Sequence, residues 1–248
     1  MNKLDLANYP GAAIGKNVEI YCDNFSYDSH FTIEDDVYIK AKSISLGKNC
    51  KIQGKTRISS LRETLESFSM GDESLIGFNS QILVPLFSMG DYSQIFNNAL
   101  VSGYKPVTLG HNCWVGQMAI LNSAETLTIG NNVRMGGNNQ IWTHVASGEL
   151  LEGSTFNSEK PITIEDNVWM MGFGHTVSPG VTIARNCVVM SGSVVSKSTE
   201  PFKTYSGIPA KDITDKLPAW KKLTIDEKFS LLEKFVNEFK ETFPQFKD

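Results

Sequence analysis

A short pattern that recurs nine times constrains the fold of this chain more than any other feature of its sequence. An aliphatic residue or Met opens the pattern and a turn-like tripeptide follows. A small residue comes four places after the opening, and another aliphatic residue or Met comes six places after it. The openings are Ile14, Ile33, Leu46, Met70, Met89, Leu109, Ile129, Ile164 and Ile183. Such self-similarity is typical of a solenoid of stacked structural units.

The spacing within the pattern indicates short strands rather than helices. An amphipathic helix returns to one face after three and four residues, whereas a step of six fits strands that each turn a corner. Three sides make one triangular coil of about 18 residues, and five of the steps between openings are 19 or 20. The steps of 13 and 24 sum to about two coils, so we expect a register slip between Ile33 and Met70. The step of 35 predicts one coil plus a long excursion.

Composition narrows the class of protein. The chain has 248 residues, a hydrophobic content of 41% and a net charge of −4, so no basic surface predicts nucleic-acid binding. No apolar run reaches the length of a membrane span, and the amino terminus lacks a hydrophobic signal core, which favours a cytoplasmic protein. Cys50, Cys113 and Cys187 occupy the small slot of the pattern and are expected to be buried thiols, whereas Cys22 has no assigned role.

Three stretches interrupt the repeat, at 59–69, 102–107 and 145–161. Insertions in a solenoid are loops that gather on one face and often build the binding site. We therefore predict a β-helix domain over 1–212 with an extruded loop at 145–161. A helical tail is expected to follow over 213–248.

The tail carries a helix-start signal, with Thr224 as the N-cap and Glu227 three residues later. Pro244 lies past the expected end of the helix. Apolar residues follow the cap at helical spacing, at Ile225, Phe229, Leu232, Val236 and Phe239. We expect this apolar stripe to pack on the prism or on a neighbouring subunit, and a partner-binding helix is the alternative.

The segment 141–212 resembles the hexapeptide-repeat acyltransferases, more closely their branch of sugar and xenobiotic O-acetyltransferases. The motifs that carry the resemblance are NNQIWTHVASGE, PITIEDNVWM, VSPGVTIARNCVVMSGSVVSK and SGIPAKDI. The resemblance implies an all-β solenoid, a left-handed parallel β-helix with an extruded active-site loop. It also implies a homotrimer that binds acetyl-coenzyme A between adjacent subunits. The handedness comes from the resemblance and not from the repeat.

His144 ends a repeat directly before the long loop, which is where the catalytic His of that family lies. Acyl transfer to a hydroxyl or an amine needs a base that takes the proton of the acceptor. An imidazole serves near neutral pH because its unperturbed pKa is about 6.5. The resemblance therefore makes His144 the candidate general base.

The coenzyme contacts are also implied by position in the family's motifs. Ser191 and Gly192 match small residues whose backbone pairs with the pantetheine arm. Ser196 and Lys197 match a pair near the adenine and the phosphates, and Lys211 matches a basic residue that meets the phosphates.

The oxyanion site of the family is a backbone amide, which falls here near Gly172 or Phe173. The run MMGFGHTVSPG is one residue longer than is usual in the family, and this extra residue affects that amide. His175 lies in the same run and is the second candidate for the base.

The acceptor site is the least specified part. Asn122, Ser123 and Glu125 occupy positions where sugar-acetylating relatives carry acceptor ligands, and Glu149 and Glu152 lie in the loop. The expected activity is acetyl transfer from acetyl-coenzyme A to a hydroxyl, or alternatively an amine, of a sugar or glycan intermediate, without a metal. The alternatives are a xenobiotic, antibiotic or serine O-acetyltransferase and a non-catalytic scaffold. A zinc carbonic anhydrase built on the same prism would need several His residues from adjacent coils on one metal, and this chain has no His pair at ligand spacing.

Overall fold

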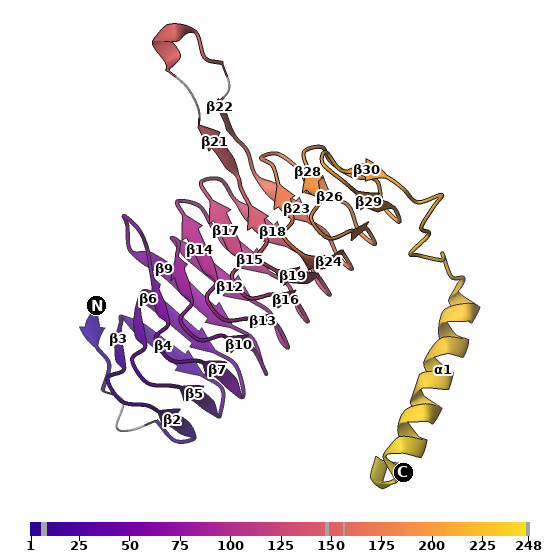
Figure 1. Ribbon diagram of the computed structural model, residues 1–248. Helices are drawn as coiled ribbons and strands as arrows, with labels where there is room; N and C mark the ends of the chain where they lie inside the picture. The colour runs from indigo at the N-terminus through magenta and orange to yellow at the C-terminus, as the bar shows by residue number, and fades with distance from the viewer. Residues whose placement is uncertain (6–8, 147–148, 156, 247–248) are drawn as a thin grey trace.

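The computed structural model describes residues 1–5, 9–146, 149–155 and 157–246, and its body is a three-sided β-helix of about ten coils (Figure 1). Each coil crosses three faces in the same order, named here B, A and C. Face B is an 11-stranded sheet, and faces A and C form one 17-stranded sheet because β6 (Tyr38–Leu46) turns from face A onto face C. The predicted solenoid is confirmed.

The strands of each face stack in parallel along the axis. Face B contains β2 (Ala12–Ile14), β5 (Phe31–Ile33), β7 (Cys50–Ile52), β10 (Leu75–Ile76), β13 (Gln94–Ile95), β16 (Trp114–Val115), β19 (Arg134–Gly137), β24 (Trp169–Phe173), β27 (Val188–Val189), β29 (Thr204–Ser206) and antiparallel β30 (Lys211–Asp212). Face A contains β3 (Glu19–Cys22), β8 (Arg57–Ser59), β11 (Gln81–Leu83), β14 (Leu100–Gly103), β17 (Ile120–Ser123), β20 (Gln140–Ile141), β25 (Thr176–Val177), β28 (Val194–Val195) and the edge strand β1 (Asn2–Lys3), which is antiparallel to β3. Face C contains β4 (Asn24–Tyr27), β9 (Leu65–Met70), β12 (Leu86–Met89), β15 (Val107–Leu109), β18 (Leu127–Ile129), β23 (Ile162–Ile164) and β26 (Thr182–Ile183).

Two of the three edges turn through the same tight corner. A residue with positive φ sits in each corner, as Asn17 does at 57° on the B/A edge and Asn49 at 54° on the C/B edge. Asn and Asp tolerate this left-handed conformation better than other non-glycine residues. Their side chains also link successive coils, because the Asn17 amide donates to the Asp36 carboxylate at 3.0 Å. The repeated tripeptides therefore specify two edges of the prism.

The expected register slip near residue 46 is wrong, because the openings of the pattern lie on two different edges. Ile14 and Ile33 align with Ile52 on face B, whereas Leu46 aligns with Met70 on face C. The step of 13 thus moves from the B/A edge to the C/B edge while the coils stay in register. The step of 24 is long because residues 60–64 bulge out between β8 and β9.

The inward rows form one continuous hydrophobic core along the prism. Phe68 and Phe87 stack within it with their ring centroids 5.8 Å apart. Cys50, Cys113 and Cys187 are buried free thiols as predicted, and Cys22 on β3 is buried as well. Burial raises the pKa of all four thiols, so they pack as small apolar groups.

The tail forms α1 (Ile225–Thr242) and a short 3-10 turn, η3 (Pro244–Phe246). Thr224 and Glu227 complete the predicted capping box. The helix stands away from the prism (Figure 1), none of its side chains is buried, and Phe229 is 61% exposed. Packing of the stripe on its own prism is therefore wrong, and contact with a neighbouring subunit stays a prediction. No helix in the described part of the chain has the length and apolarity of a membrane span.

Candidate active site

The edge where face A turns onto face C is the one that carries extensions of the coil (Figure 1). Residues 60–64 leave the prism between β8 and β9, residues 104–106 connect β14 to β15, and residues 142–161 separate β20 from β23. The predicted interruption at 59–69 is thus shorter than expected, because its second half is strand β9. The gathering of insertions on one edge is what a binding site on a solenoid requires.

His144 begins the third and longest extension. It opens β21 (His144–Ala146), which pairs antiparallel with β22 (Asn157–Glu159), so that His144 lies opposite Glu159. The predicted loop is therefore a β-hairpin that projects from the prism, with a 3-10 turn, η2 (Leu150–Glu152), near its tip. Positions 147, 148 and 156 of that loop lie outside the described residues.

Asn122 orients the imidazole of His144. Its side-chain oxygen lies 2.9 Å from Nδ1 of His144 and accepts from the Thr143 hydroxyl at 3.0 Å and the Ala124 amide at 3.3 Å. Its side-chain nitrogen lies 3.5 Å from the Ser102 carbonyl oxygen, which agrees with this orientation of the amide. Because an amide oxygen only accepts, Nδ1 of His144 must be the donor, and Nε2 then carries the free lone pair.

A hollow of about 320 Å³ opens beside His144 and is built from all three extensions. Leu61 comes from the first, Tyr104 from the second, and Glu159 from the hairpin. Asn122 lines the same hollow from face A. The candidate base His144, the Asn122 side chain that orients its ring and a hollow for a small substrate therefore occur together on one edge.

The other predicted acceptor residues lie outside this hollow. Ser123 is fully buried, and Glu125 accepts from the Thr126 amide at 3.4 Å without lining the space. Glu149 and Glu152 lie near the hairpin tip, where the Glu149 carboxylate accepts from the Leu151 amide at 3.1 Å. Of the predicted acceptor ligands, the structure brings only Asn122 to His144 among the described residues.

His175 belongs to the core of the prism. It fills an inward slot on the B/A edge, is fully buried, and lies with Nδ1 2.6 Å from the side-chain oxygen of Asn139 and Nε2 3.3 Å from the Val189 carbonyl oxygen. Burial lowers the pKa of His175, which favours the neutral ring. A side chain without access to solvent cannot reach a substrate, so His175 does not compete with His144.

The predicted coenzyme residues of the B/A edge lie together. Phe173 and Gly172 end β24, and Ser191 and Gly192 follow β27 one coil later. The Phe173 amide donates to the Ser191 hydroxyl at 3.3 Å, and the Gly192 amide donates to the Phe173 carbonyl at 2.9 Å. The extra residue of this run forms a bulge against β19, where a side chain on Gly136 would meet the Gly172 carbonyl oxygen at 1.5 Å.

The remaining predicted coenzyme residues lie elsewhere on the last coils. Ser196 and Lys197 are exposed on the A/C edge after β28, and Lys211 is exposed on β30. The neighbouring Asp212 binds Thr214 and Lys203, whose hydrogen bonds lower the pKa of its carboxyl group to about 2. Asp212 is therefore already engaged, and Lys211 has no ion-pair partner within the described residues.

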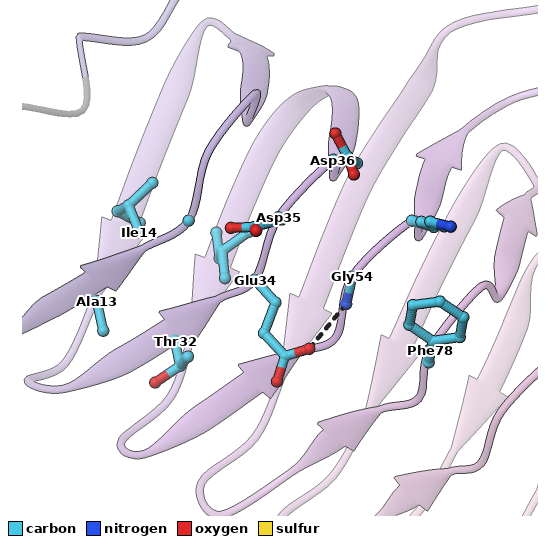
Figure 2. Close-up of a pocket in the computed structure, with 11 residues that line it drawn as sticks. Ala13, Ile14, Thr32, Glu34, Asp35, Asp36, Gly54 and Phe78 are labelled. Carbon is cyan, nitrogen blue, oxygen red and sulfur yellow. Dashed lines mark hydrogen bonds between the residues drawn. The ribbon is translucent and has the colours of Figure 1, made fainter.

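A larger hollow lies far from His144, on the first coils (Figure 2). It measures about 610 Å³ and contains Glu34 and Asp35. Glu34 pairs with Lys51 at 2.7 Å and accepts from the Gly54 amide at 3.0 Å, which is the bond drawn in Figure 2. Asp35 accepts from the Lys16 amide at 2.7 Å. These carboxylates link successive coils at the corner.

Tyr104, Leu61 and Glu159 were not identified from the sequence. The signal that could have found them is the pattern on the B/A edge, which continues through Ile52, Ile76, Ile95 and Val115. Counting the repeat on both edges places the three long interruptions on the third edge. The side chains of the extensions then become the candidates for the substrate site.

Comparison with known proteins agrees with this architecture. No protein-family model matches the chain. Galactoside O-acetyltransferase of Escherichia coli is 32% identical over 111 residues, which are 44% of this chain and 54% of that protein. Galactoside O-acetyltransferase of Lactococcus lactis is 34% identical over 128 residues, which are 48% and 60% of the two chains. The chain spans about half the length of the curated relatives it matches.

The solved structure of the polySia-specific acetyltransferase NeuO matches the fold with a TM-score of 0.52 and 16% identity, over 87% of this chain and 91% of that one. The fold and the A/C edge thus define a β-helix solenoid from which a hairpin with His144 at its base projects. The sequence matches and the repeat agree with the resemblance of this chain to the hexapeptide-repeat acetyltransferases.

Proposed function

We propose that the protein transfers the acetyl group of acetyl-coenzyme A to a hydroxyl of a sugar or glycan, with an amine as the alternative acceptor. The observation that carries this proposal is the hydrogen bond from His144 Nδ1 to Asn122 inside the hollow, which leaves Nε2 free to accept a proton. The galactoside O-acetyltransferases among the relatives support the choice of a sugar acceptor.

Acetyl transfer needs one residue that acts first as a general base and then as a general acid. Nε2 of His144 accepts the hydroxyl proton as the acceptor oxygen bonds to the acyl carbon. It then returns the proton to the sulfur that leaves, so that the imidazole ends neutral and the thiol is released. Asn122 favours the required tautomer throughout, because its oxygen holds the proton on Nδ1.

The chain also fits the acyl donor, which supplies an activated thioester. The B/A edge of the last coils is open at Gly192, where a Cβ would meet nothing within 4 Å. We assign this edge, with Ser191 and Gly192, to the pantetheine arm, and the Gly172 or Phe173 amide to the oxyanion. Ser196, Lys197 and Lys211 are assigned to the adenine and phosphate end, where exposed ammonium groups suit phosphate.

A homotrimer is part of the proposal because the assigned residues lie on two edges of one prism. His144 is on the A/C edge, whereas Gly172 and Gly192 are on the B/A edge. A neighbouring subunit can bring the second edge to the first. Exposed aromatic side chains near the B/A edge support such a contact, because Trp114 and Phe173 line an open hollow of about 520 Å³.

The proposal is tested by incubating the protein with isotopically labelled acetyl-coenzyme A and a panel of galactosides, glucosides, amino sugars and serine. Mass spectrometry is expected to find the label on a sugar, and hydroxylamine treatment should remove it if it is an ester and leave it if it is an amide. A protein that is not retained on a coenzyme A column and that labels no acceptor would be a scaffold, and the proposal would fail.

A further inference from the structure

A line of three connected hollows runs along the A/C edge, from His144 towards the amino-terminal coils. The hollow beside His144 shares Gly103 and Tyr104 with a second, smaller one of about 100 Å³. That one shares Arg62 and Glu63 with a third, of about 370 Å³. The three hollows therefore adjoin one another along the bulge at 60–64.

The far end of this path is basic. Lys40 on β6, Arg57 on β8 and Arg62 on the bulge line the third hollow, and Glu63 is the one carboxylate among its lining residues. The described residues offer none of these three cations an ion pair at salt-bridge distance. Such a concentration of unpaired positive charge, in a chain of net charge −4, favours an anionic ligand.

Tyr104 lies between the basic end and His144. Its side chain is 47% exposed, and the Arg62 guanidinium lies 4.3 Å from its ring centroid. The cation holds the ring in place by a cation–π contact while the ring still lines both adjoining hollows. A fixed aromatic ring is a platform for the apolar face of a sugar ring.

We infer that the acceptor is an extended anionic saccharide. Its reactive hydroxyl lies at His144, a sugar unit stacks on Tyr104, and a carboxylate or phosphate on a later unit binds Lys40 and Arg57. The inference deepens the proposed function and rests on it for the identity of the reacting end.

The geometry of the solenoid sets the spacing of this acceptor. Arg57 on β8 lies three coils from Asn122 on β17, and Lys40 lies four coils away. Coils stack at about 4.8 Å, so the cations lie roughly 14 and 19 Å from the level of Asn122. That span exceeds one sugar ring, so the anionic group belongs to another unit of the acceptor.

The test measures binding without the coenzyme, so that its failure is distinct from a failure of acetyl transfer. Three probes are titrated calorimetrically into the full-length protein at low salt. They are a hexasaccharide with alternating uronic acids, a nucleoside diphosphate-linked hexose, and a neutral glucan hexasaccharide. The double variant Lys40→Gln with Arg57→Gln is compared with the wild type. Lys42→Gln is the matched control, because Lys42 lies on the same strand but pairs with Glu66 at 2.7 Å.

The inference expects an acidic probe to bind the wild type more tightly than the neutral one. The double variant should lose roughly 3- to 30-fold in affinity for that probe, as two partly exposed ion pairs allow. The control should stay within about twofold of the wild type. The probe that responds identifies the source of the charge, carboxylate or phosphate. Tyr104→Ala should weaken the neutral and acidic hexasaccharides alike, by about 2- to 10-fold.

Equal affinity for the acidic and neutral probes would overturn the inference, as would an unchanged affinity in the double variant. An acidic probe that binds with the expected dependence but is never acetylated would instead count against the proposed transfer, and the anionic groove would stand.

Discussion

Replacing Asn122 by Ala tests whether this residue orients the base, and the structure sets the cost in stability. The side chain is 9% exposed, and its oxygen accepts three hydrogen bonds. The Thr143 hydroxyl keeps the Asn122 backbone carbonyl as an acceptor at 3.2 Å, and His144 is exposed enough to bind water. Of the three donors to that oxygen, only the buried Ala124 amide is left without a replacement partner. One such loss costs about 1–3 kcal/mol, which lowers Tm by roughly 2–10 °C.

The effect on catalysis should exceed the effect on folding. Without the Asn122 oxygen, the proton of His144 is free to move to Nε2 and the ring is free to turn. The base is then in the wrong tautomer or orientation for part of the time. We expect kcat to fall by about 10- to 100-fold, by analogy with the loss when a residue that orients a metal-binding His is removed. KM for acetyl-coenzyme A should change little, because Asn122 orients the base and is not among the residues assigned to the coenzyme.

The assay is steady-state kinetics at a temperature well below the Tm of the variant, with Tm measured on the same preparation. Asn122→Asp is the conservative variant, since it keeps an oxygen opposite Nδ1, and it should recover most of kcat. A variant Asn122→Ala with lowered Tm but kcat within twofold of the wild type would show that Asn122 is structural only. The orientation of His144 would then need another explanation.

Three further results follow from the structure. Lys211→Ala should raise KM for acetyl-coenzyme A by about 2- to 5-fold and leave KM for the acceptor unchanged, and unchanged coenzyme affinity would remove Lys211 from the site. Gly136→Ala should lower the free energy of unfolding by about 3 kcal/mol, because its new Cβ meets the Gly172 carbonyl oxygen. The control Gly137→Ala, whose new Cβ has its nearest atom at 3.3 Å, should lower it by about 1 kcal/mol or less. Equal losses of the two variants in thermal or urea unfolding would refute the bulge. Sedimentation at micromolar concentration should give a trimer, and a monomer would remove the two-edge site.

Much of the fold was predictable because its two tight corners repeat a local rule. Each corner combines an inward aliphatic residue, a turn residue that accepts positive φ and a small inward residue, all within nine positions of sequence. The prediction failed where one local pattern fits two places in the coil. Ile14 and Leu46 carry the same pattern on different edges, and the sequence spacing alone does not distinguish an edge change from a slip.

The hollow at the candidate base was predictable in part, because His144 lies in a motif of the resemblance whereas Tyr104 and Leu61 do not. His175 has the same side chain, but it occupies the slot that Ala119 and Asn139 fill in earlier coils, one residue late because of the bulge. That α1 stands away from its own prism was not predictable, since its apolar stripe fits its own prism or another surface equally well. Tyr104 and Leu61 reach His144 only through the stacking of coils, which brings distant extensions together.

The central claim, that His144 is the general base, is tested most directly by the turnover of His144→Ala. The account predicts that kcat falls by about 100- to 10,000-fold, the usual contribution of a positioned base. Coenzyme A binding and Tm should stay near their wild-type values, because the half-buried side chain lies at the base of the hairpin and outside the stacked core. A variant that folds, binds coenzyme A and keeps more than about a tenth of wild-type kcat would contradict the account.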